Sequence, residues 1–196
     1  EYDLYRRIGF DLCGQQLRVR LEGLPLPESS DQSEVNTGWI PALFDALRAR
    51  TGGLTLNEED RSWHEAHRNV RWYWTGSAEA PTAYAAIGRG IDLQGLVHEW
   101  GGRRADLLKI LARIRAEQPQ AELLGPAWHF DRYTIPYTGA PTEFLCMARI
   151  LDYAAVLGAF PASRDIRKEL ENSEGSDGDV LRALLGPPSE AFPFPL

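Results

Sequence analysis

The N-terminal part of the chain changes from a helical to an alternating hydrophobic pattern. Tyr2–Ile8 is predicted to be the end of a helix, because Gly9 is a helix-stop residue. Over Phe10–Leu21 the apolar positions alternate with polar ones, which is typical of a strand, and Gly14 favours a bend in it. Pro25–Val35 is rich in Pro, Ser, Asp and Glu without periodicity, so this segment is the predicted linker.

Helical spacing returns in three later segments. Trp39–Arg50 places its large apolar residues on one face, and two glycines soon follow it. Asn57–His67 begins with a residue type that caps helices and carries Asp60 three positions later, in an acidic first turn. Ala105–Ala116 repeats leucine and isoleucine at helical spacing and is predicted to end before Pro119.

The remaining apolar runs are short and rich in aromatic or aliphatic residues. They predict the strands Val70–Thr75, Thr82–Ile87, Gly95–Trp100, Ala121–Leu124 and Glu143–Leu151. The first two strands are separated by a loop of small residues, which indicates an antiparallel hairpin. The third and fourth flank a helix, and such a crossover is usually right-handed and joins parallel strands. We therefore expect an α/β fold with a mixed sheet.

The C-terminal region shows less regular structure. A helix is predicted over Tyr153–Phe160, after which the chain becomes acidic and polar, apart from a short apolar helix over Val180–Leu185. Pro193 and Pro195 exclude regular structure at the end, because proline lacks a backbone N–H donor. Residues 161–196 are therefore predicted to form an acidic, proline-containing tail.

Composition and charge narrow the classes of function. The chain has 196 residues, of which 43% are hydrophobic and 25% charged, and no apolar run approaches the length of a membrane span. The net charge of −7 argues against nucleic-acid binding, which needs a surplus of Lys and Arg. The two cysteines form no CxxC pair, so we expect neither a zinc site nor a disulfide framework, and a reducing, cytoplasmic setting.

The order of elements and two local segments resemble the GNAT (GCN5-related) N-acetyltransferases. Leu4–Phe10 (LYRRIGF) is similar to the GNAT element in which a helix carrying Tyr runs into Gly-Phe, and Ala83–Leu124 is similar to the central strands and helix of a GNAT unit. The resemblance implies a central mixed sheet of about five to seven strands flanked by helices. It also implies the C-terminal part of a tandem-GNAT protein, with 1–24 as the tail of a preceding GNAT domain, 36–160 as a GNAT-like domain and 161–196 as the tail.

The segment that corresponds to the coenzyme site departs from the family pattern. GNAT enzymes bind the pyrophosphate of acetyl-coenzyme A with Gln/Arg-x-x-Gly-x-Gly/Ala before a helix, where bare backbone N–H groups hold the anion. Here Arg103 and Arg104 are the candidate coenzyme-binding residues, but Asp106 and Leu108 stand at the glycine positions. A carboxylate in the first helical turn competes with phosphate, and leucine blocks close backbone approach. We therefore do not expect acetyl-coenzyme A to bind well here.

The resemblance also implies catalytic roles for two residues. Tyr5 matches the tyrosine that protonates the departing thiolate in many GNAT enzymes, and packing at the end of its helix is the structural alternative. Glu99 lies where these enzymes place a carboxylate that removes a proton from the amine, and an ion pair with Arg103 or Arg104 is the alternative. The implied mechanism is direct attack of a neutral amine on the thioester, with a backbone N–H of the central strand stabilising the oxyanion.

The tryptophans support two interpretations. Trp72 and Trp74 share a face of their strand, and with Trp100 they either fill the core or line a cleft for an amine or acyl substrate. Strict alternation along the predicted strand Gly95–Trp100 places Glu99 on the face of Val97, away from Trp100.

The histidines and cysteines are assigned structural roles. His64 and His67 have the sequence H-E-A-H rather than H-E-x-x-H, so the spacing does not predict a metal site. Cys146 lies in an apolar strand and is expected to be an inert small hydrophobic residue, and nothing around Cys13 predicts a reactive thiol.

We therefore expect the C-terminal region of a GNAT-type N-acetyltransferase that transfers acetyl from acetyl-coenzyme A to a primary amine. This part is expected to lack a competent coenzyme site and to be inactive alone. The alternative is a non-catalytic GNAT-like scaffold or oligomerisation module, since the strand Phe10–Leu21 offers an edge to another chain or to the domain's own sheet. A binding protein for an aromatic or amine ligand is a third hypothesis. The expected partners are a small-molecule amine and a second copy of the chain, not nucleic acid or a membrane.

Overall fold

The computed structural model describes residues 2–28, 34–49, 56–67, 69–91, 93–137, 142–151 and 180–181. The chain divides into two compact units. Unit 1 comprises Glu1–Leu17, Pro126–Phe130 and Thr138–Leu196, and unit 2 comprises Arg18–Gly125 and Asp131–Tyr137.

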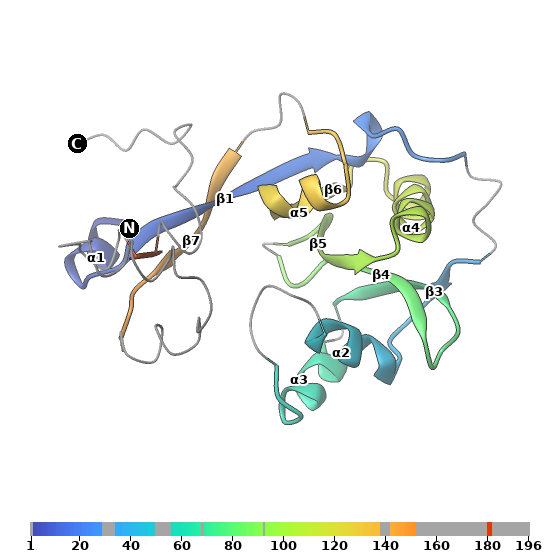
Figure 1. Ribbon diagram of the computed structural model, residues 1–196, viewed down its shortest axis with the longest axis horizontal. Helices are drawn as coiled ribbons and strands as arrows, with labels where there is room; N and C mark the ends of the chain where they lie inside the picture. Colours follow the sequence, from blue (N-terminus) through green and yellow to red (C-terminus); the bar gives the residue numbers. More distant parts are fainter. Residues whose placement is uncertain are drawn as a thin grey trace, which may run out of the picture. The chain divides into compact units, whose positions relative to one another are not determined.

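A meander of antiparallel strands forms the centre of unit 2 (Figure 1). β3 (Arg71–Gly76) pairs with β4 (Pro81–Ile87), and β4 pairs with β5 (Leu96–Gly102). The hairpin predicted from the two aromatic runs is thereby confirmed. The outer edge of β3 carries β2 (Asn36–Thr37), a strand too short to leave a pattern in the sequence.

The predicted strand–helix–strand crossover follows the meander. α4 (Arg104–Glu117) leads from β5 to β6 (Glu122–Pro126), and these two strands are parallel, with Leu96 opposite Glu122. The strand order of unit 2 is β2-β3-β4-β5-β6, followed by the end of β1 (Asp11–Arg20). The predicted mixed sheet flanked by helices is confirmed.

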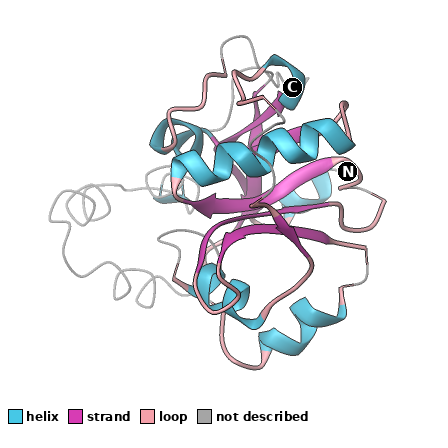
Figure 2. Cartoon of the chain, turned by 90° about the vertical axis from the view of Figure 1, so that its right-hand side faces the viewer, coloured by secondary structure: helices cyan, strands magenta, loops and turns pink. Residues whose placement is uncertain are grey.

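Helices cover both faces of the sheet in unit 2 (Figure 2). α2 (Pro41–Arg48) packs with Leu43 and Leu47 on the face that carries Trp72. Tyr73, the next residue of β3, points to the other face and donates its hydroxyl to Glu117 of α4. The sheet is therefore the middle layer between α2 and α4.

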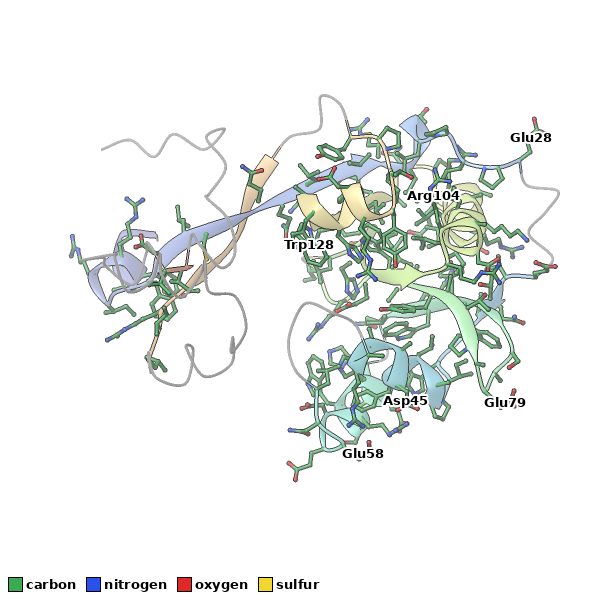
Figure 3. All side chains as sticks on the ribbon, viewed as in Figure 1. Glu28, Asp45, Glu58, Glu79, Arg104 and Trp128 are labelled. Carbon is green, nitrogen blue, oxygen red and sulfur yellow. The ribbon has the colours of Figure 1, made fainter. Side chains whose placement is uncertain are left out.

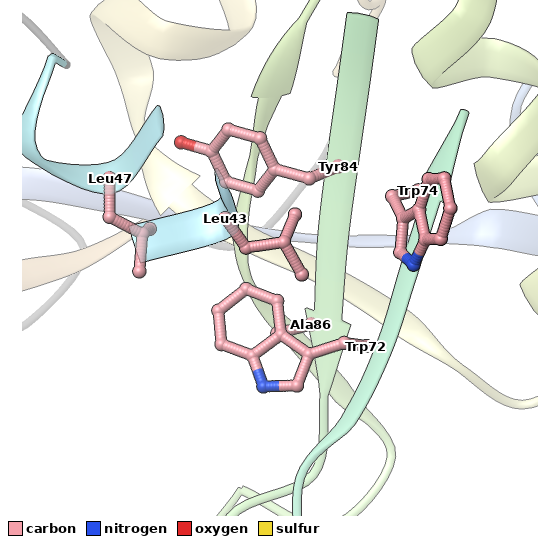
Figure 4. Close-up of a cluster of buried hydrophobic side chains, with 6 residues drawn as sticks. All are labelled: Leu43, Leu47, Trp72, Trp74, Tyr84 and Ala86. Atoms are coloured by element: carbon pink, nitrogen blue, oxygen red, sulfur yellow. The ribbon is translucent and has the colours of Figure 1, made fainter. Parts of the chain in front are cut away.

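Aromatic side chains fill the core beneath α2 (Figure 4). Trp72 and Trp74 are only 5% and 8% exposed, so both belong to the core, and Trp72 also lines part of an open hollow at the start of β3. Trp100 lies outside this cluster, because its cross-strand partner Ala85 faces the opposite side from Tyr84. On the α4 side, full burial of each large aliphatic residue contributes about 1.5–3 kcal/mol. These residues are Leu107, Ile110, Leu111 and Ile114.

The predicted cap at Asn57 is confirmed by its hydrogen bonds. The Asn57 Oδ1 atom accepts the N–H groups of Glu59 (2.9 Å) and Asp60 (3.2 Å), and Asp60 Oδ2 accepts the N–H of Asn57 (2.8 Å). Regular helix, α3 (Asp60–Ala66), begins three residues later than predicted, because the capping turn precedes it.

Arg61 connects α3 to α2 at the corner where Figure 3 labels Asp45 and Glu58. Its Nη2 atom lies 3.4 Å from Asp45 Oδ1 and its Nε atom 2.5 Å from Glu58 Oε1. The guanidinium carbon also lies 4.9 Å from the ring centroid of the fully buried Phe44. Exposed ion pairs contribute little to stability because solvent screens them, so the contact of Arg61 with Phe44 also helps to hold α3 against α2.

Unit 1 is built around an antiparallel pair of strands. β1 pairs with β7 (Thr142–Ala148), with Asp11 opposite Ala148. α1 (Tyr2–Arg7) precedes β1, which confirms the predicted helix and the strand after it. Gly14, where a bend was predicted, has φ +69°. The edge of the N-terminal strand thus finds a partner within the chain.

The C-terminal part of the structure differs from the sequence pattern in two places. The last strand ends at Ala148 instead of the predicted Leu151. The segment that follows β6 shows no clear period in the sequence, and the structure places α5 (Ala127–Arg132) there. The predicted helix Tyr153–Phe160 lies outside the described residues.

Cys13 belongs to a small apolar cluster in unit 1. It is fully buried and packs with Ile150, Val180 and Leu181, which agrees with an unreactive thiol. Within the described ranges, no helix has both the length and the apolar character needed to cross a membrane.

Substitution of Gly102, the last residue of β5, tests the packing of this strand on β4. Gly102 has φ +105°, and a Cβ atom there would lie 2.4 Å from both the carbonyl oxygen of Thr82 and Cα of Ala83. We expect Gly102→Ala to lower the free energy of unfolding by about 3 kcal/mol or more in urea denaturation. Gly90→Ala is the matched control, with φ +65° and nothing within 4 Å of its Cβ. This control should lose only about 1–2 kcal/mol. Equal losses would contradict the close approach at Gly102.

Candidate functional site

The segment predicted to correspond to the coenzyme site is the junction between β5 and α4. The N–H of Arg103 donates to the carbonyl of Thr82 (2.8 Å), which fastens the junction to β4. The first hydrogen bond within the helix runs from the N–H of Leu107 to the carbonyl of Arg103 (2.9 Å), and no side chain caps the helix. The predicted strand, turn and helix N-terminus are all present.

β5 and β6 are paired only at their beginnings. Leu96 lies opposite Glu122 and Val97 opposite Leu123, and among the described residues the pairing of these two strands stops there. Trp100 lies on β5 beyond the last pair. Its indole Nε1 donates to the carbonyl of Leu124 on β6 (2.7 Å), and the side chain is only 4% exposed. The indole thus replaces the backbone hydrogen bonds that the parting strands no longer make.

Tyr133 completes the packing at this junction. Its ring centroid lies 5.4 Å from that of Trp100, and its hydroxyl oxygen accepts the backbone N–H of Gly102 (2.9 Å). The residue is 8% exposed. Sequence reasoning missed Tyr133, because its segment shows no periodicity and its partner is 31 residues away.

The two predicted coenzyme-binding arginines have other partners. Arg104 donates its Nε–H to the backbone carbonyl of Tyr133 (2.8 Å). Arg103 Nε lies 3.7 Å from Asp106 Oδ2, and the Arg103 side chain is 74% exposed. Asp106 is in the first turn of α4, where its carboxylate occupies the positive end of the helix dipole.

These residues do not fit the diphosphate and thioester of acetyl-coenzyme A. The helix N-terminus that would hold a diphosphate carries the Asp106 carboxylate, and Arg104 is engaged with Tyr133. The backbone N–H of Gly102, at the end of the central strand, is already bound to the Tyr133 hydroxyl. The Trp100 indole connects β5 to β6 through its hydrogen bond to the carbonyl of Leu124.

Strict alternation is correct for Glu99 and Trp100, which lie on opposite faces of the sheet, but wrong for Glu99 and Val97. The pairing of β4 and β5 shifts between Ala86 and Ile87, so that Ala86 lies opposite Glu99 and Ile87 opposite Val97. Ala86 and Ile87 are neighbours in one strand and face opposite sides. The prediction that Glu99 shares a face with Val97 is therefore wrong. A β-bulge at His98 causes the difference, because it inserts one extra residue into β5.

The bulge brings Glu99 into electrostatic range of histidines. His98 makes a 2.9 Å hydrogen bond through Nε2 with the carbonyl of Gly88. Burial lowers the pKa of His98 and that of His64, and the charge of Glu99 opposes the shift in both cases. Glu99 is half-buried on the side of the sheet that α2 covers.

Aromatic side chains contact His64 of α3 and His67, the residue that follows this helix. The ring of Trp63 lies 4.1 Å from that of His67 and 4.4 Å from the Arg89 guanidinium carbon, while His64 stacks on Trp39 at 6.3 Å. Among the described residues, no group of three or more His, Cys, Asp or Glu side chains is arranged to hold a metal ion.

Tyr5 belongs to unit 1, whereas Glu99, Arg103 and Arg104 belong to unit 2. The Tyr5 side chain is 42% exposed and its ring packs edge-on against Phe10, with the centroids 5.9 Å apart. The catalytic role implied for Tyr5 stays a prediction.

Comparison with known proteins found similarity to solved structures only. No family model and no curated protein matches the chain. A GCN5-related N-acetyltransferase from Anabaena variabilis is similar over 76% of this chain and 42% of its own, at 13% identity and a TM-score of 0.45. A probable N-acyltransferase from Enterococcus faecalis is similar over 77% of this chain and 43% of its own, at 14% identity and a TM-score of 0.49. A GCN5-related N-acetyltransferase from Sphaerobacter thermophilus is similar over 76% and 57%, at 12% identity and a TM-score of 0.42.

The chain thus spans about half the length of these structures.

The buried state of His98 predicts a pH dependence of stability. Because burial lowers its pKa below the ordinary value of 6.5, the unfolded chain binds more protons than the folded one just below that pH. The free energy of unfolding should therefore fall as the pH decreases below 6.5, and His64, whose pKa burial also lowers, contributes in the same direction. Urea denaturation of the native chain and of His98→Gln, which removes one of these two groups, measures this, and the pH slope should be smaller in His98→Gln. An unchanged pH slope in His98→Gln would refute the assignment. Glu58 and Glu117 have pKa values lowered from 4.5 and therefore titrate at lower pH than the histidines.

Proposed function

We propose that this chain is part of a GNAT-type N-acetyltransferase that transfers acetyl from acetyl-coenzyme A to a primary amine. We propose further that this part of the protein does not hold the coenzyme. The resemblance of Leu4–Phe10 and Ala83–Leu124 to the family supports the first statement. The second rests on the side chains at the β5–α4 junction.

The observation that carries the second statement is the pair of hydrogen bonds made by Trp100 and Tyr133. The Trp100 indole donates to Leu124, and the Tyr133 hydroxyl accepts the N–H of Gly102. A ligand entering between β5 and β6 would have to displace the buried Trp100 indole and break its hydrogen bond to Leu124. It would also leave the carbonyl of Leu124 without its buried donor.

The same packing favours the alternative of a non-catalytic scaffold or oligomerisation module. A unit whose strand gap is filled by its own side chains is rigid and suited to supporting a neighbouring domain. Tyr5 distinguishes the two proposals, because it acts as a proton donor only in the enzyme.

A thermal-shift titration tests whether the coenzyme binds. We expect no change in the melting temperature of this chain at millimolar acetyl-coenzyme A, because a ligand stabilises only a state that binds it. The titration is repeated on Arg104→Gln, with Arg20→Gln as the matched exposed arginine, whose side chain is 74% exposed. A rise in melting temperature that is lost in Arg104→Gln and kept in Arg20→Gln would overturn the proposal.

Substitution of Tyr5 tests the catalytic role. The substitution Tyr5→Phe is made in the whole protein as its own cells produce it. It should reduce the rate of acetyl transfer to primary amines by about 100-fold or more, since general-acid catalysis contributes a rate factor of this size. The initial rate is measured with saturating acetyl-coenzyme A, and Tyr137→Phe serves as the control tyrosine variant. An unchanged rate in Tyr5→Phe would support the scaffold alternative.

A further inference from the structure

An open hollow of about 650 Å³ lies in unit 2 where the last turn of α4 meets the beginning of β3. Its volume is in the range of small-molecule sites. Two arginines, Arg71 and Arg113, line it together with Glu117 and the polar residues Thr37 and Asn69. α4 has 14 residues and is therefore about 20 Å long, with the β5–α4 junction at its opposite end. The hollow is thus separate from the site discussed above.

Glu117 holds the two arginines in place. Its Oε2 atom accepts the Tyr73 hydroxyl (2.6 Å) and Nη1 of Arg71 (2.9 Å), and its Oε1 atom accepts Nε of Arg113 (2.6 Å). Tyr73 is fully buried, so its hydroxyl gives the carboxylate a fixed position. Partial burial raises the pKa of Glu117, but the hydrogen bonds from Tyr73 and Arg113 outweigh it and the net shift is downward. Glu117 is therefore ionised at neutral pH.

Each guanidinium uses only part of its donor set within the protein. Arg71 acts through Nη1, which also contacts the Tyr73 hydroxyl at 3.3 Å, and Arg113 acts through Nε. Each arginine has five N–H groups in a planar fork. The Arg71 and Arg113 side chains are 57% and 43% exposed, so the remaining N–H groups are accessible from the hollow.

The charges select the kind of ligand. Two guanidinium groups and one carboxylate leave a single positive charge at the hollow, which one monoanion neutralises. A phosphate dianion would leave an excess negative charge beside Glu117. The chain as a whole has a net charge of −7, so its overall electrostatic field does not attract anions, and any anion binding depends on the local arginines. Planar carboxylates match the arginine fork and make two parallel hydrogen bonds with it.

We propose that this hollow binds a small organic molecule through a single carboxylate held by Arg71 and Arg113. Thr37 and Asn69 offer hydrogen bonds to polar groups on the rest of the ligand. Glu117 is the positioning residue that aligns the two guanidinium groups. The proposal is independent of the acetyltransferase assignment.

The test compares benzoate with its neutral isostere benzamide on the intact chain. We expect saturable binding of benzoate at low ionic strength by isothermal titration calorimetry, with movement of the Gly38 and Val70 amide resonances in ¹H–¹⁵N NMR spectra. Benzamide should bind at least about tenfold more weakly, because it lacks the charge that the arginine fork recognises. Added salt should weaken benzoate binding, since the arginines are partly exposed.

Variants of two arginines provide the control. Arg113→Gln removes one guanidinium on an exposed helix surface, where the fold tolerates substitution, and should weaken benzoate binding about tenfold or more. Arg20→Gln, far from the hollow in sequence and absent from its lining, should bind benzoate as the native chain does. Unchanged affinity in Arg113→Gln, equal affinity for benzamide, or absence of saturable benzoate binding overturns the proposal. Tighter binding of inorganic phosphate than of benzoate overturns the assignment to a carboxylate.

Discussion

The divergence of β5 from β6 determines which side chains unit 2 needs at the junction between β5 and α4. After Val97 and Leu123 the two parallel strands exchange no further backbone hydrogen bonds among the described residues, so their inner groups need other partners. Trp100 supplies one such partner, because its indole N–H donates to the carbonyl of Leu124. A buried carbonyl left without a donor costs about 1–3 kcal/mol, so the filled gap is an energetic requirement of this sequence.

The same requirement links the fold to the proposed loss of coenzyme binding. A ligand between the strands would have to take over the hydrogen bond to Leu124 and also displace Tyr133 from Gly102. Asp106 acts in the same direction, because it places a negative charge at the helix end where a diphosphate would bind. Steric hindrance and electrostatic repulsion at this junction therefore both disfavour binding of a diphosphate, although they arise from residues in different elements.

Local patterns predicted the elements, whereas contacts between distant segments were hidden from the sequence. The aromatic runs of β3 and β4 and the leucine spacing of α4 gave the meander and the crossover, because strands and helices have fixed periods. The two residues of β2 are too few to show a period. The bulge at His98 escaped detection because it depends on the register with β4, and that register places Glu99 and Val97 on opposite faces. Tyr133 reaches Gly102 across 31 residues, a distance that no local signal spans.

The C-terminal end of α4 shows a placement that helix stability alone does not favour. Glu117 lies in the last turn, where the helix dipole is unfavourable to a negative charge. Arg113 precedes it by four residues, and this order is less favourable than the reverse. Glu117 is nevertheless ionised, because the Tyr73 hydroxyl and the two guanidinium groups stabilise its carboxylate. A neutral residue at this position would suit the helix better but would leave Arg71 and Arg113 without a common acceptor. We therefore infer that the role of the Glu117 carboxylate is to position the two guanidinium groups at the hollow.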